Sequence, residues 1–593
     1  MESINNSKMI RILRIFGFLF ALVFVFTLVF AHSAKAAGTT GAVPENGTYV
    51  YYENGVKSAK TGLAKSTDGT GWYYMKSGTY DMTAEGICKR IDGVGGWFYV
   101  RDGKYRTDLT GIAKKVDRTG GWYYVKNGVY KTNVTGISKK IDGSGGWYYV
   151  KNGVYTTSAT GIAKRADGVG GWYYVKNGVY KTNVTGIAKR ADGVGGWYYV
   201  KNGVYNTNAT GIAKKVDGTG GWYYVKNGVY KAGATGIARR ADGVGGWYYV
   251  KNGVYNTSAT GITKKADSSS DSRWFYVQSG VYKSTASGIA KKADGTGGWY
   301  YVRNGVYRPH ESGIAKKADG SSSTWFYVKD GTYRTSFTGL ARKADCSSDT
   351  QFYVKNGIYT KTDIASYSFG SGTYKIEKGI ATLQSGYLDP WIQDWGYYFY
   401  QMDGYLHADW AFKIKNPNVD YAIQEFSMPI DFKSSSGEVL KTVSSTMHIH
   451  IAAGDTITVG TDLGYKIEAE VPSYAEYKIE YSDDIFVEQE TLGIAKVSDF
   501  TFSETSRAYE EDTGRYRYSG YVTNNSDVST HSFIGVIYYK NGQMLGGTGG
   551  LMLDIKVGKK VFFTGYLGYG PAGFDSYEFY VQLIPLVDGE VMY

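Results

Sequence analysis

Cysteine is almost absent from this sequence. Its 593 residues include only Cys88 and Cys346, which lie far apart, so we expect no disulfide bridge between them. This scarcity excludes a disulfide scaffold, which is the usual device of small exported domains. The chain therefore has to obtain its stability from packing, and repeated packing units can supply it.

Long apolar runs are also absent, except at the N-terminus. Lys8, Arg11 and Arg14 precede an apolar run at 15–30, and small residues follow at 34–36. A basic start, a short apolar stretch and small residues are typical of a signal peptide, here residues 1–36, followed by a linker at 37–47. We expect an exported protein that is soluble after cleavage, with no transmembrane span; an uncleaved N-terminal anchor is the alternative.

Histidine is scarce, and motifs of catalysis are lacking. The six histidines include the alternating pair His448 and His450, but no further ligand accompanies them, so we predict no metal site and no cofactor. No nucleophile elbow, His-Glu-Xaa-Xaa-His helix or P-loop occurs. We therefore predict a protein that is not an enzyme. The less favoured alternative is a carbohydrate-active enzyme with its acids in 366–593, where Asp483–Asp484 and Glu510–Asp512 are carboxylate clusters.

Charge is unevenly distributed along the chain. Residues 366–593 contain 16 Lys and Arg and 30 Asp and Glu, a formal charge of −14, which leaves +27 for the preceding residues out of a total of +13. The basic part favours an anionic polymer as partner. Because the chain is expected to be exported, we predict no nucleic-acid partner and favour teichoic acids, other anionic glycans or acidic lipid surfaces.

Internal repetition is the dominant feature of the sequence. One unit runs from Gly161 to Thr185 and contains four basic side chains and one acidic side chain. Its tryptophan recurs at intervals of 25 to 27 residues, at Trp72, Trp97, Trp122, Trp147, Trp172, Trp197, Trp222, Trp247, Trp274, Trp299 and Trp325. The period predicts a repeat array over residues 48–365.

Each unit contains the signals of a β-hairpin. The segment 172–175 (Trp-Tyr-Tyr-Val) is rich in strand formers, and Asn177-Gly178 suits a two-residue type I′ turn. That turn would pair Val175 with Tyr180, and Tyr173 with Thr182. It places Tyr173, Val175 and Tyr180 on one face, and Trp172 and Tyr174 on the other. Since a single hairpin cannot bury two aromatic faces, successive hairpins are expected to stack as a solenoid.

This pattern resembles the cell-wall-binding repeats of Firmicutes, which include choline-binding and glucan-binding members. The shared order is Thr-Gly, a basic residue, Gly, Trp-Tyr-Tyr, Asn-Gly, an aromatic residue and Thr-Gly. The resemblance implies a hairpin solenoid in a Gram-positive surface protein. In choline-binding members, a cage uses the strand Trp, a hairpin aromatic and a Trp after Thr-Gly. Here the last position is isoleucine, so the resemblance implies an incomplete cage; the isoleucines are Ile112, Ile137, Ile162, Ile187 and Ile212.

Two roles are open for the aromatic residues of the array: a structural core, or stacking on sugar rings beside basic groups that pair with phosphate or carboxylate. The candidate ligand-binding residues are Trp122, Tyr124, Trp147, Tyr149, Trp172, Tyr174, Lys176, Trp197, Tyr199, Trp222, Tyr224, Trp247 and Tyr249. The pair Lys164 and Arg165 is a further basic candidate. Many weak sites can hold a repetitive polymer firmly, although a passive adhesive stalk would show the same repetition.

The acidic C-terminal part is predicted to be duplicated. Short alternating strands divided by turn residues favour a β-sandwich at 366–484 and a second at 485–593. The block at 415–418 (Lys-Asn-Pro-Asn) has a counterpart at 523–526 (Thr-Asn-Asn-Ser). The second copy is similar to the FxLYD family of small immunoglobulin-like domains, which implies a fold and an interaction role, with a protein as partner.

Taken as a whole, the sequence predicts an all-β protein, a hairpin-repeat solenoid followed by two small β-sandwich domains. We expect a secreted, wall-associated surface protein that binds teichoic acid, peptidoglycan or an extracellular glycan non-covalently. The structural stalk without a wall ligand is the first alternative to this function.

Overall fold

The computed structural model describes residues 38–593 apart from 268–270, 272, 403–404, 425, 435, 448–449, 461–471, 473, 482, 514, 569, 572, 585, 588–589 and 592–593. The expected signal peptide, residues 1–36, lies outside the described residues. The chain divides into two compact units, Met1–Tyr255 and Asn256–Tyr593. Among the described residues the regular secondary structure of both units is almost entirely β-strand, and the predicted all-β class is confirmed.

Each repeat folds into three short strands joined by a tight turn. In the repeat that starts at Gly161 these are β16 (Gly161–Lys164), β17 (Trp172–Lys176) and β18 (Val179–Tyr180). Asn177 and Gly178 have φ angles of 52° and 72°, so the predicted type I′ turn is confirmed.

The residue pairing of the hairpin matches the predicted pairing next to the turn and differs from it farther from the turn. Val175 pairs with Tyr180 as predicted. The predicted pairing of Tyr173 with Thr182 is wrong, because the return strand ends at Tyr180 and Tyr173 pairs with Val204 of the next repeat. Strand β16, which sequence analysis did not predict, supplies the other neighbour and pairs Ala163 with Tyr173.

The other repeats of the first unit have the same three strands. The first strands are β4 (Gly62–Lys65), β7 (Gly86–Lys89), β10 (Gly111–Ala113), β13 (Gly136–Ser138), β19 (Gly186–Ala188), β22 (Gly211–Ala213) and β25 (Gly236–Ala238). The central strands are β5 (Trp72–Lys76), β8 (Trp97–Arg101), β11 (Tyr123–Lys126), β14 (Tyr148–Lys151), β20 (Tyr198–Lys201), β23 (Tyr223–Lys226) and β26 (Tyr248–Lys251). The return strands are β6 (Thr79–Tyr80), β9 (Lys104–Tyr105), β12 (Val129–Tyr130), β15 (Val154–Tyr155), β21 (Val204–Tyr205), β24 (Val229–Tyr230) and β27 (Val254–Tyr255). An initial hairpin, β1 (Gly41–Glu45), β2 (Thr48–Glu53) and β3 (Val56–Lys57), precedes them.

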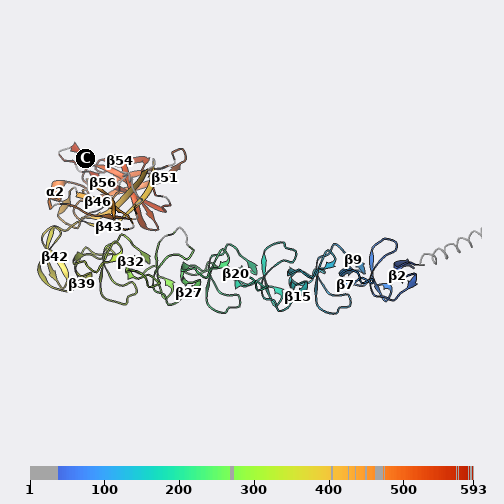
Figure 1. Cartoon of the computed structure of the whole chain (residues 1–593). Coiled ribbons are helices and arrows are strands. Elements are labelled where there is room, and N and C mark those ends of the chain that lie inside the picture. Colours follow the sequence, from blue (N-terminus) through green and yellow to red (C-terminus); the bar gives the residue numbers. More distant parts are fainter. Residues whose placement is uncertain are drawn as a thin grey trace, which may run out of the picture. The chain divides into compact units, whose positions relative to one another are not determined.

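Successive repeats are joined through their backbones and through a shared core. The amide of Ile162 donates to the carbonyl of Lys189, and the amide of Ala191 donates back to the carbonyl of Ile162, at 2.8 and 2.9 Å. Figure 1 shows the hairpins of the first unit following one another in chain order. Because each repeat bonds to the next, the array has nearest-neighbour stability.

The two aromatic faces of each hairpin are buried against different neighbours, as predicted. Tyr173, Val175 and Tyr180 pack against the preceding repeat, in a cluster with Ile137 and Tyr149. Trp172 and Tyr174 pack against the following repeat. The stacked-hairpin solenoid is therefore the source of the array's core.

The second unit begins with further repeats of the same kind. Their strands are β28 (Gly261–Thr263), β29 (Phe275–Gln278), β30 (Val281–Tyr282), β31 (Gly288–Ala290), β32 (Tyr300–Arg303), β33 (Val306–Tyr307), β34 (Gly313–Ala315), β35 (Phe326–Lys329), β36 (Thr332–Tyr333), β37 (Gly339–Ala341), β38 (Gln351–Lys355) and β39 (Ile358–Tyr359). The sheet continues beyond residue 365, through β40 (Ile364–Phe369), β41 (Gly372–Glu377) and β42 (Ile380–Gly386), because β42 pairs with β38.

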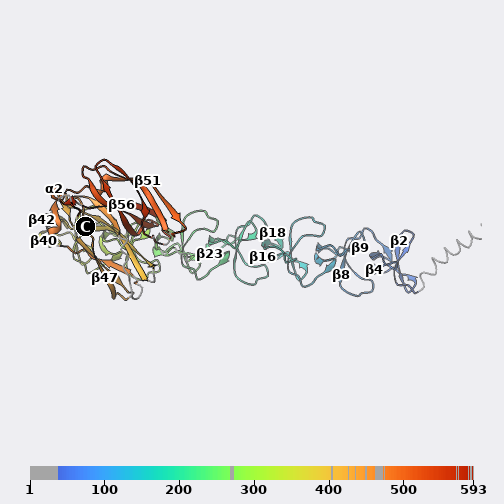
Figure 2. The same ribbon diagram turned by 90° about the horizontal axis from the view of Figure 1, so that it is seen from above.

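The C-terminal part contains two small β-sandwiches, whose strands are visible from a second direction in Figure 2. The first pairs β43 (Trp391–Met402), β44 (Tyr405–Lys415) and β48 (Thr456–Gly460) in one sheet, and β46 (Phe426–Lys433), β47 (Val439–Met447) and β49 (Tyr474–Tyr477) in the other. Short elements complete it: β45 (Tyr421–Ile423), β50 (Phe486–Glu488), η1 (Asp483–Ile485) and α2 (Gln489–Leu492). Trp395, Trp410, Ile430 and Phe432 form its core between the sheets.

The second sandwich repeats this topology after η2 (Val497–Asp499). One sheet contains β51 (Phe500–Glu510), β52 (Arg515–Asn524) and β55 (Lys560–Tyr566); the other contains β53 (Thr530–Lys540), β54 (Gln543–Ile555) and β56 (Ser576–Ile584), with the hairpin β57 (Leu586–Val587) and β58 (Glu590–Val591) at the end.

The predicted duplication is visible at the asparagine corners. The buried Asn416 amide donates to the carbonyl of Tyr421, and the buried Asn524 amide donates to that of Val528, at 2.8 and 2.7 Å. Each asparagine thus closes the same corner of its own sandwich.

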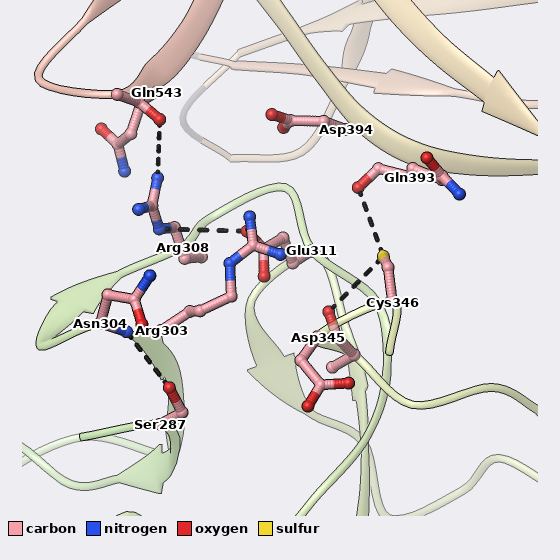
Figure 3. Close-up of polar contacts among 12 residues, drawn as sticks. Ser287, Arg303, Asn304, Arg308, Glu311, Asp345, Cys346, Gln393, Asp394 and Gln543 are labelled. Carbon is pink, nitrogen blue, oxygen red and sulfur yellow. Dashed lines mark hydrogen bonds and ion pairs between the residues drawn. The ribbon is translucent and has the colours of Figure 1, made fainter. Parts of the chain in front are cut away.

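Within the second unit, the sandwiches contact the repeats at a divergent segment, Arg308–Glu311 (Figure 3). Arg308 donates to the carbonyl of Gly542 at 3.1 Å, and Gln543 donates to that of Tyr307 at 3.0 Å. Glu311 pairs with Arg303 at 2.8 Å and is only 3% exposed. We name the contact formed by 303–311, 394–397 and 542–545 the junction.

Candidate functional site

The strand tryptophan of most repeats lies next to two of the protein's own cations. Over the ring of Trp172, the Lys164 ammonium lies 5.5 Å from the centroid and the Arg190 guanidinium lies 4.6 Å from it. Lys164 reaches the ring because it is paired with Trp172 across β16 and β17. Arg190 belongs to the next repeat and is placed by its parallel bridge to Ile162.

This arrangement recurs along the chain. The lysine of the same repeat lies 5.1–5.5 Å from the ring centroid, and the cation of the next repeat lies 4.6–5.7 Å from it. The tryptophans with both cations are Trp97, Trp122, Trp147, Trp172, Trp197, Trp222, Trp274, Trp299 and Trp325. Each contact of this kind is worth about 0.5–1 kcal/mol at an exposed site.

The structure divides the predicted ligand-binding residues into two groups. The tryptophans Trp122, Trp147, Trp172, Trp197, Trp222 and Trp247 are half-buried and reach the surface, and Lys176 is exposed. The second tyrosines of the strands are buried, at 1–3% exposure: Tyr124, Tyr149, Tyr174, Tyr199, Tyr224 and Tyr249. Their assignment to a ligand site is corrected here, because the inward alternation of the central strand places them in the core between repeats.

The position that resemblance assigned to the third wall of a choline cage is also in the core. Ile137 is 1% exposed and packs with Tyr149 and Val175. The equivalent isoleucines Ile112, Ile162, Ile187 and Ile212 are 1–2% exposed. The space between hairpins is therefore filled by aliphatic packing, and the remaining tryptophan wall already has two cations beside it. A third cation such as choline would be repelled by both.

One repeat has a distinct pocket beside its tryptophan. A cavity of about 150 Å³ is lined by Lys114, Lys115, Arg118 and Trp122, and also by the carboxylates of Glu85 and Asp142. Arg118 has φ 59°, in the left-handed region that the neighbouring repeats fill with glycine, as at Gly143. A non-glycine residue in that conformation carries backbone strain, as Cys346 does at the equivalent position with φ 56°.

Acidic groups near this pocket are already engaged. Glu85 accepts from the Tyr99 hydroxyl at 2.7 Å and from Arg101 at 3.1 Å. Asp117 accepts from the Thr119 hydroxyl at 2.7 Å and from its amide, and these bonds lower the pKa of the Asp117 carboxyl. Asp142 accepts from the Ser144 amide at 2.8 Å. Lys114 and Arg118 are exposed, and Lys115 is half-buried.

Comparison with known families decides the nature of the array. A family model described as a choline-binding repeat matches eight segments of the chain, 92–104, 110–129, 140–154, 158–179, 183–206, 208–229, 241–256 and 293–306. The array is built from repeats of the choline-binding type. No curated protein matches the chain. Choline-binding repeats are modules of surface proteins that bind cell-wall polymers non-covalently, so the predicted repeat family is confirmed, while the FxLYD resemblance stays a prediction.

Other sequence predictions meet the structure only in part. His450 is buried, and its partner in the alternating pair, His448, lies outside the described residues. In the described ranges, no three His, Cys, Asp or Glu side chains gather as a metal site requires. Among the same residues, no helix has the length and apolar character needed to cross a membrane.

The basic pair Lys164 and Arg165 was predicted from the sequence, but the position of the second cation was not. Arg165 lies over Trp147 of the preceding repeat, 4.6 Å from its centroid. The contact depends on how repeats stack, so spacing inside one unit did not predict it. The signal that could have found it is the constant presence of a cation at this position in nearly every repeat.

Proposed function

We propose that the protein is an exported, non-enzymatic anchor whose choline-binding-type repeats hold an anionic cell-wall polymer, such as teichoic acid, rather than free choline. The observation that supports this most is the pair of protein cations over nine of the strand tryptophans. An aromatic face with two cations beside it repels a quaternary ammonium and attracts an anion that can reach both cations.

The charge of the repeats supports the same function. The unit 161–185 has four basic side chains and one acidic one, and the array repeats this excess many times. A single ammonium-anion contact in water is weak. Once one repeat has bound a repetitive polymer, however, later contacts become effectively intramolecular, and the total affinity rises steeply.

The charge of the C-terminal sandwiches is opposite in sign to that of the repeats, and this difference supports a separate role for them. They are acidic, with a formal charge of −14 over 366–593, and therefore have no affinity for a polyanion. We propose that they are presented to a protein partner at the surface. The absence of recognisable catalytic motifs in the sequence is the basis for assigning them a binding role.

Co-sedimentation of the full chain with Gram-positive cell walls tests this function. Half of the walls are stripped of their teichoic acids and half are left intact. The protein should pellet with intact walls and remain largely in the supernatant with stripped walls. Equal pelleting with both would assign the binding to peptidoglycan, and no pelleting with either would leave the array as a stalk.

A further inference from the structure

Ten of the repeats fall into two classes, distinguished by two positions that change together. In one class, here called Arg repeats, an arginine over the preceding tryptophan is accompanied four residues later by valine: Arg90 with Val94, Arg165 with Val169, Arg190 with Val194 and Arg240 with Val244. In the other, here called Lys repeats, a lysine is accompanied by threonine or serine: Lys115 with Thr119, Lys140 with Ser144, Lys215 with Thr219, Lys292 with Thr296, Lys317 with Ser321 and Lys343 with Ser347.

In the Arg repeats the cation is neutralised by its own loop. Arg165 pairs with Asp167, and Arg190 pairs with Asp192. The same contact joins Arg90 to Asp92 and Arg240 to Asp242. The arginine therefore has a carboxylate beside its guanidinium, and it offers little net charge to a ligand.

In the Lys repeats the loop aspartate is satisfied without the cation. The hydroxyl of Thr219 donates to Asp217 at 2.7 Å, and its amide donates at 2.9 Å. Thr119 and Thr296 bind Asp117 and Asp294 in the same way. These bonds lower the pKa of the aspartates and keep them engaged at the loop.

The lysine of such a repeat is held by aromatic rings instead. The Lys140 ammonium lies 4.8 Å from the centroid of Trp122 and 5.6 Å from that of Tyr148. In the described part of the chain, no ion pair joins Lys115, Lys140, Lys215, Lys292 or Lys317 to a carboxylate. Each of these lysines is thus held beside aromatic surface without a direct ion pair, while the loop aspartate lies near enough for the lysine to lower its pKa.

We propose that the Lys repeats bind the phosphodiester groups of the wall polymer, and that the Arg repeats serve as spacers. This inference rests on the proposed function and names the sites and the ligand group. Phosphodiester is chosen as the ligand group because the proposed function names teichoic acid as the polymer, and a lysine ammonium binds phosphate as a point charge. The aromatic rings provide surface for the polyol carbons between phosphates.

A charge-matched exchange of the two classes tests this assignment in the full chain. The first variant converts three Lys repeats: Lys115→Arg with Thr119→Val, Lys140→Arg with Ser144→Val, and Lys215→Arg with Thr219→Val. The reciprocal variant converts three Arg repeats: Arg165→Lys with Val169→Thr, Arg190→Lys with Val194→Thr, and Arg240→Lys with Val244→Thr. Both keep the net charge of the wild type, and both use loops that already fold elsewhere in this chain.

Binding to poly(glycerol phosphate) is followed by tryptophan fluorescence over a range of salt concentrations, with polygalacturonate as the carboxylate control. The first variant should bind the polyphosphate several-fold more weakly and with a shallower dependence on salt, because fewer phosphates displace counterions. The reciprocal variant should bind more tightly with a steeper dependence. Circular dichroism checks that both variants fold.

The outcomes separate this inference from the proposed function. If wild type and both variants bind the polyphosphate with equal affinity and salt dependence, the two classes are equivalent and the inference is wrong, while the anchor function stands. Equal or tighter binding of polygalacturonate by the Lys repeats would also overturn the phosphate assignment. If the wild type binds neither polymer, the proposed function itself fails.

Discussion

At the scale of single residues, the tryptophan of each repeat has a role that its sequence context conceals. The spacing of the repeats predicted aromatic residues at the right places, and the alternation along a strand predicted that Trp172 and Tyr174 share a face. It did not predict that Tyr174 would be 3% exposed while Trp172 remains half-buried. That difference arises from the neighbouring repeat, which covers one ring fully and places Arg190 over the other.

Placing a tryptophan where choline-binding repeats have the third wall of their cage should destabilise this protein and should not create a choline site. Ile137→Trp adds a large ring to a cluster in which Ile137, Tyr149 and Val175 are each 0–1% exposed. Overpacking of this kind costs about 1–3 kcal/mol. We expect a lower thermal midpoint and no gain of choline binding by calorimetric titration. A folded variant with new choline affinity would contradict this description of the core.

Substitution of Arg118 by glycine should change stability and ligand binding in opposite directions. It lies at φ 59°, and Arg118→Gly relieves this left-handed strain, which we expect to stabilise the folded array by about 0.5–1 kcal/mol. The same change removes one of the three cations that line the pocket at Trp122. Polyphosphate binding should therefore weaken while the unfolding midpoint rises. A decrease in both quantities would show that Arg118 is needed for folding.

At the scale of the hairpin, Gly178 is needed for two separate reasons. It adopts the backbone conformation of the turn, and it lets the turn pack closely against the preceding repeat. Gly178 has φ 72°, and a Cβ there would lie 2.2 Å from the carbonyl oxygen of Thr156 in the preceding repeat. Asn-Gly in the sequence predicted the turn. The contact with the neighbouring repeat could not be predicted, because it depends on how the hairpins stack.

Two glycine substitutions separate these requirements. Gly168→Ala has a similar φ of 80° but open space around its Cβ, so it should cost only the strain of the left-handed backbone, about 1 kcal/mol. Gly178→Ala adds the clash with the preceding repeat and should cost at least about 1–2 kcal/mol more. Urea unfolding of the two variants measures the difference. Equal midpoints would mean that turn docking contributes nothing to repeat stacking.

At the scale of the whole molecule, the sequence predicted the duplication of the sandwiches from the Asn-rich corners. It did not predict that the segment Arg308–Glu311 contacts the second sandwich within the second unit. The only hint is that this segment departs from the consensus of the repeats. Its partners are backbone carbonyls and distant residues such as Gln543, which leave no periodic signal in the sequence.

Two buried groups at the junction titrate with opposite effects on stability. Burial raises the pKa of Glu311 to about 7, despite Arg303 and Arg308 beside it and with Asp394 opposing them. Burial lowers the pKa of His310 to about 4. The contribution of Glu311 to the free energy of unfolding is present below pH 4.5, its pKa in the unfolded chain, and is lost as the pH rises towards 7. The contribution of His310 to the free energy of unfolding is present above pH 6.5, its pKa in the unfolded chain, and is lost as the pH falls towards 4.

Substitution of Glu311 should therefore make the effect of His310 on the pH dependence of stability measurable. In the wild type the two effects oppose each other between pH 4.5 and 6.5, so the stability of the second unit changes little in this window. Glu311→Gln should become less stable as pH falls from 6.5 to 4, by about 2–3 kcal/mol. Calorimetric unfolding of the full chain across this range checks the prediction. A variant with the pH dependence of the wild type would mean that these groups do not titrate in the junction.

Release of the wall-bound protein by sodium chloride and by choline, compared at matched ionic strength, decides whether the tryptophans bind a polyanion or a quaternary ammonium. Because nine strand tryptophans have two cations of the protein over them, we predict that salt releases the protein. We also predict that choline chloride does so no better than sodium chloride at the same concentration. Release by millimolar choline, far below the salt concentration needed, would show that the tryptophans bind quaternary ammonium and would contradict the account.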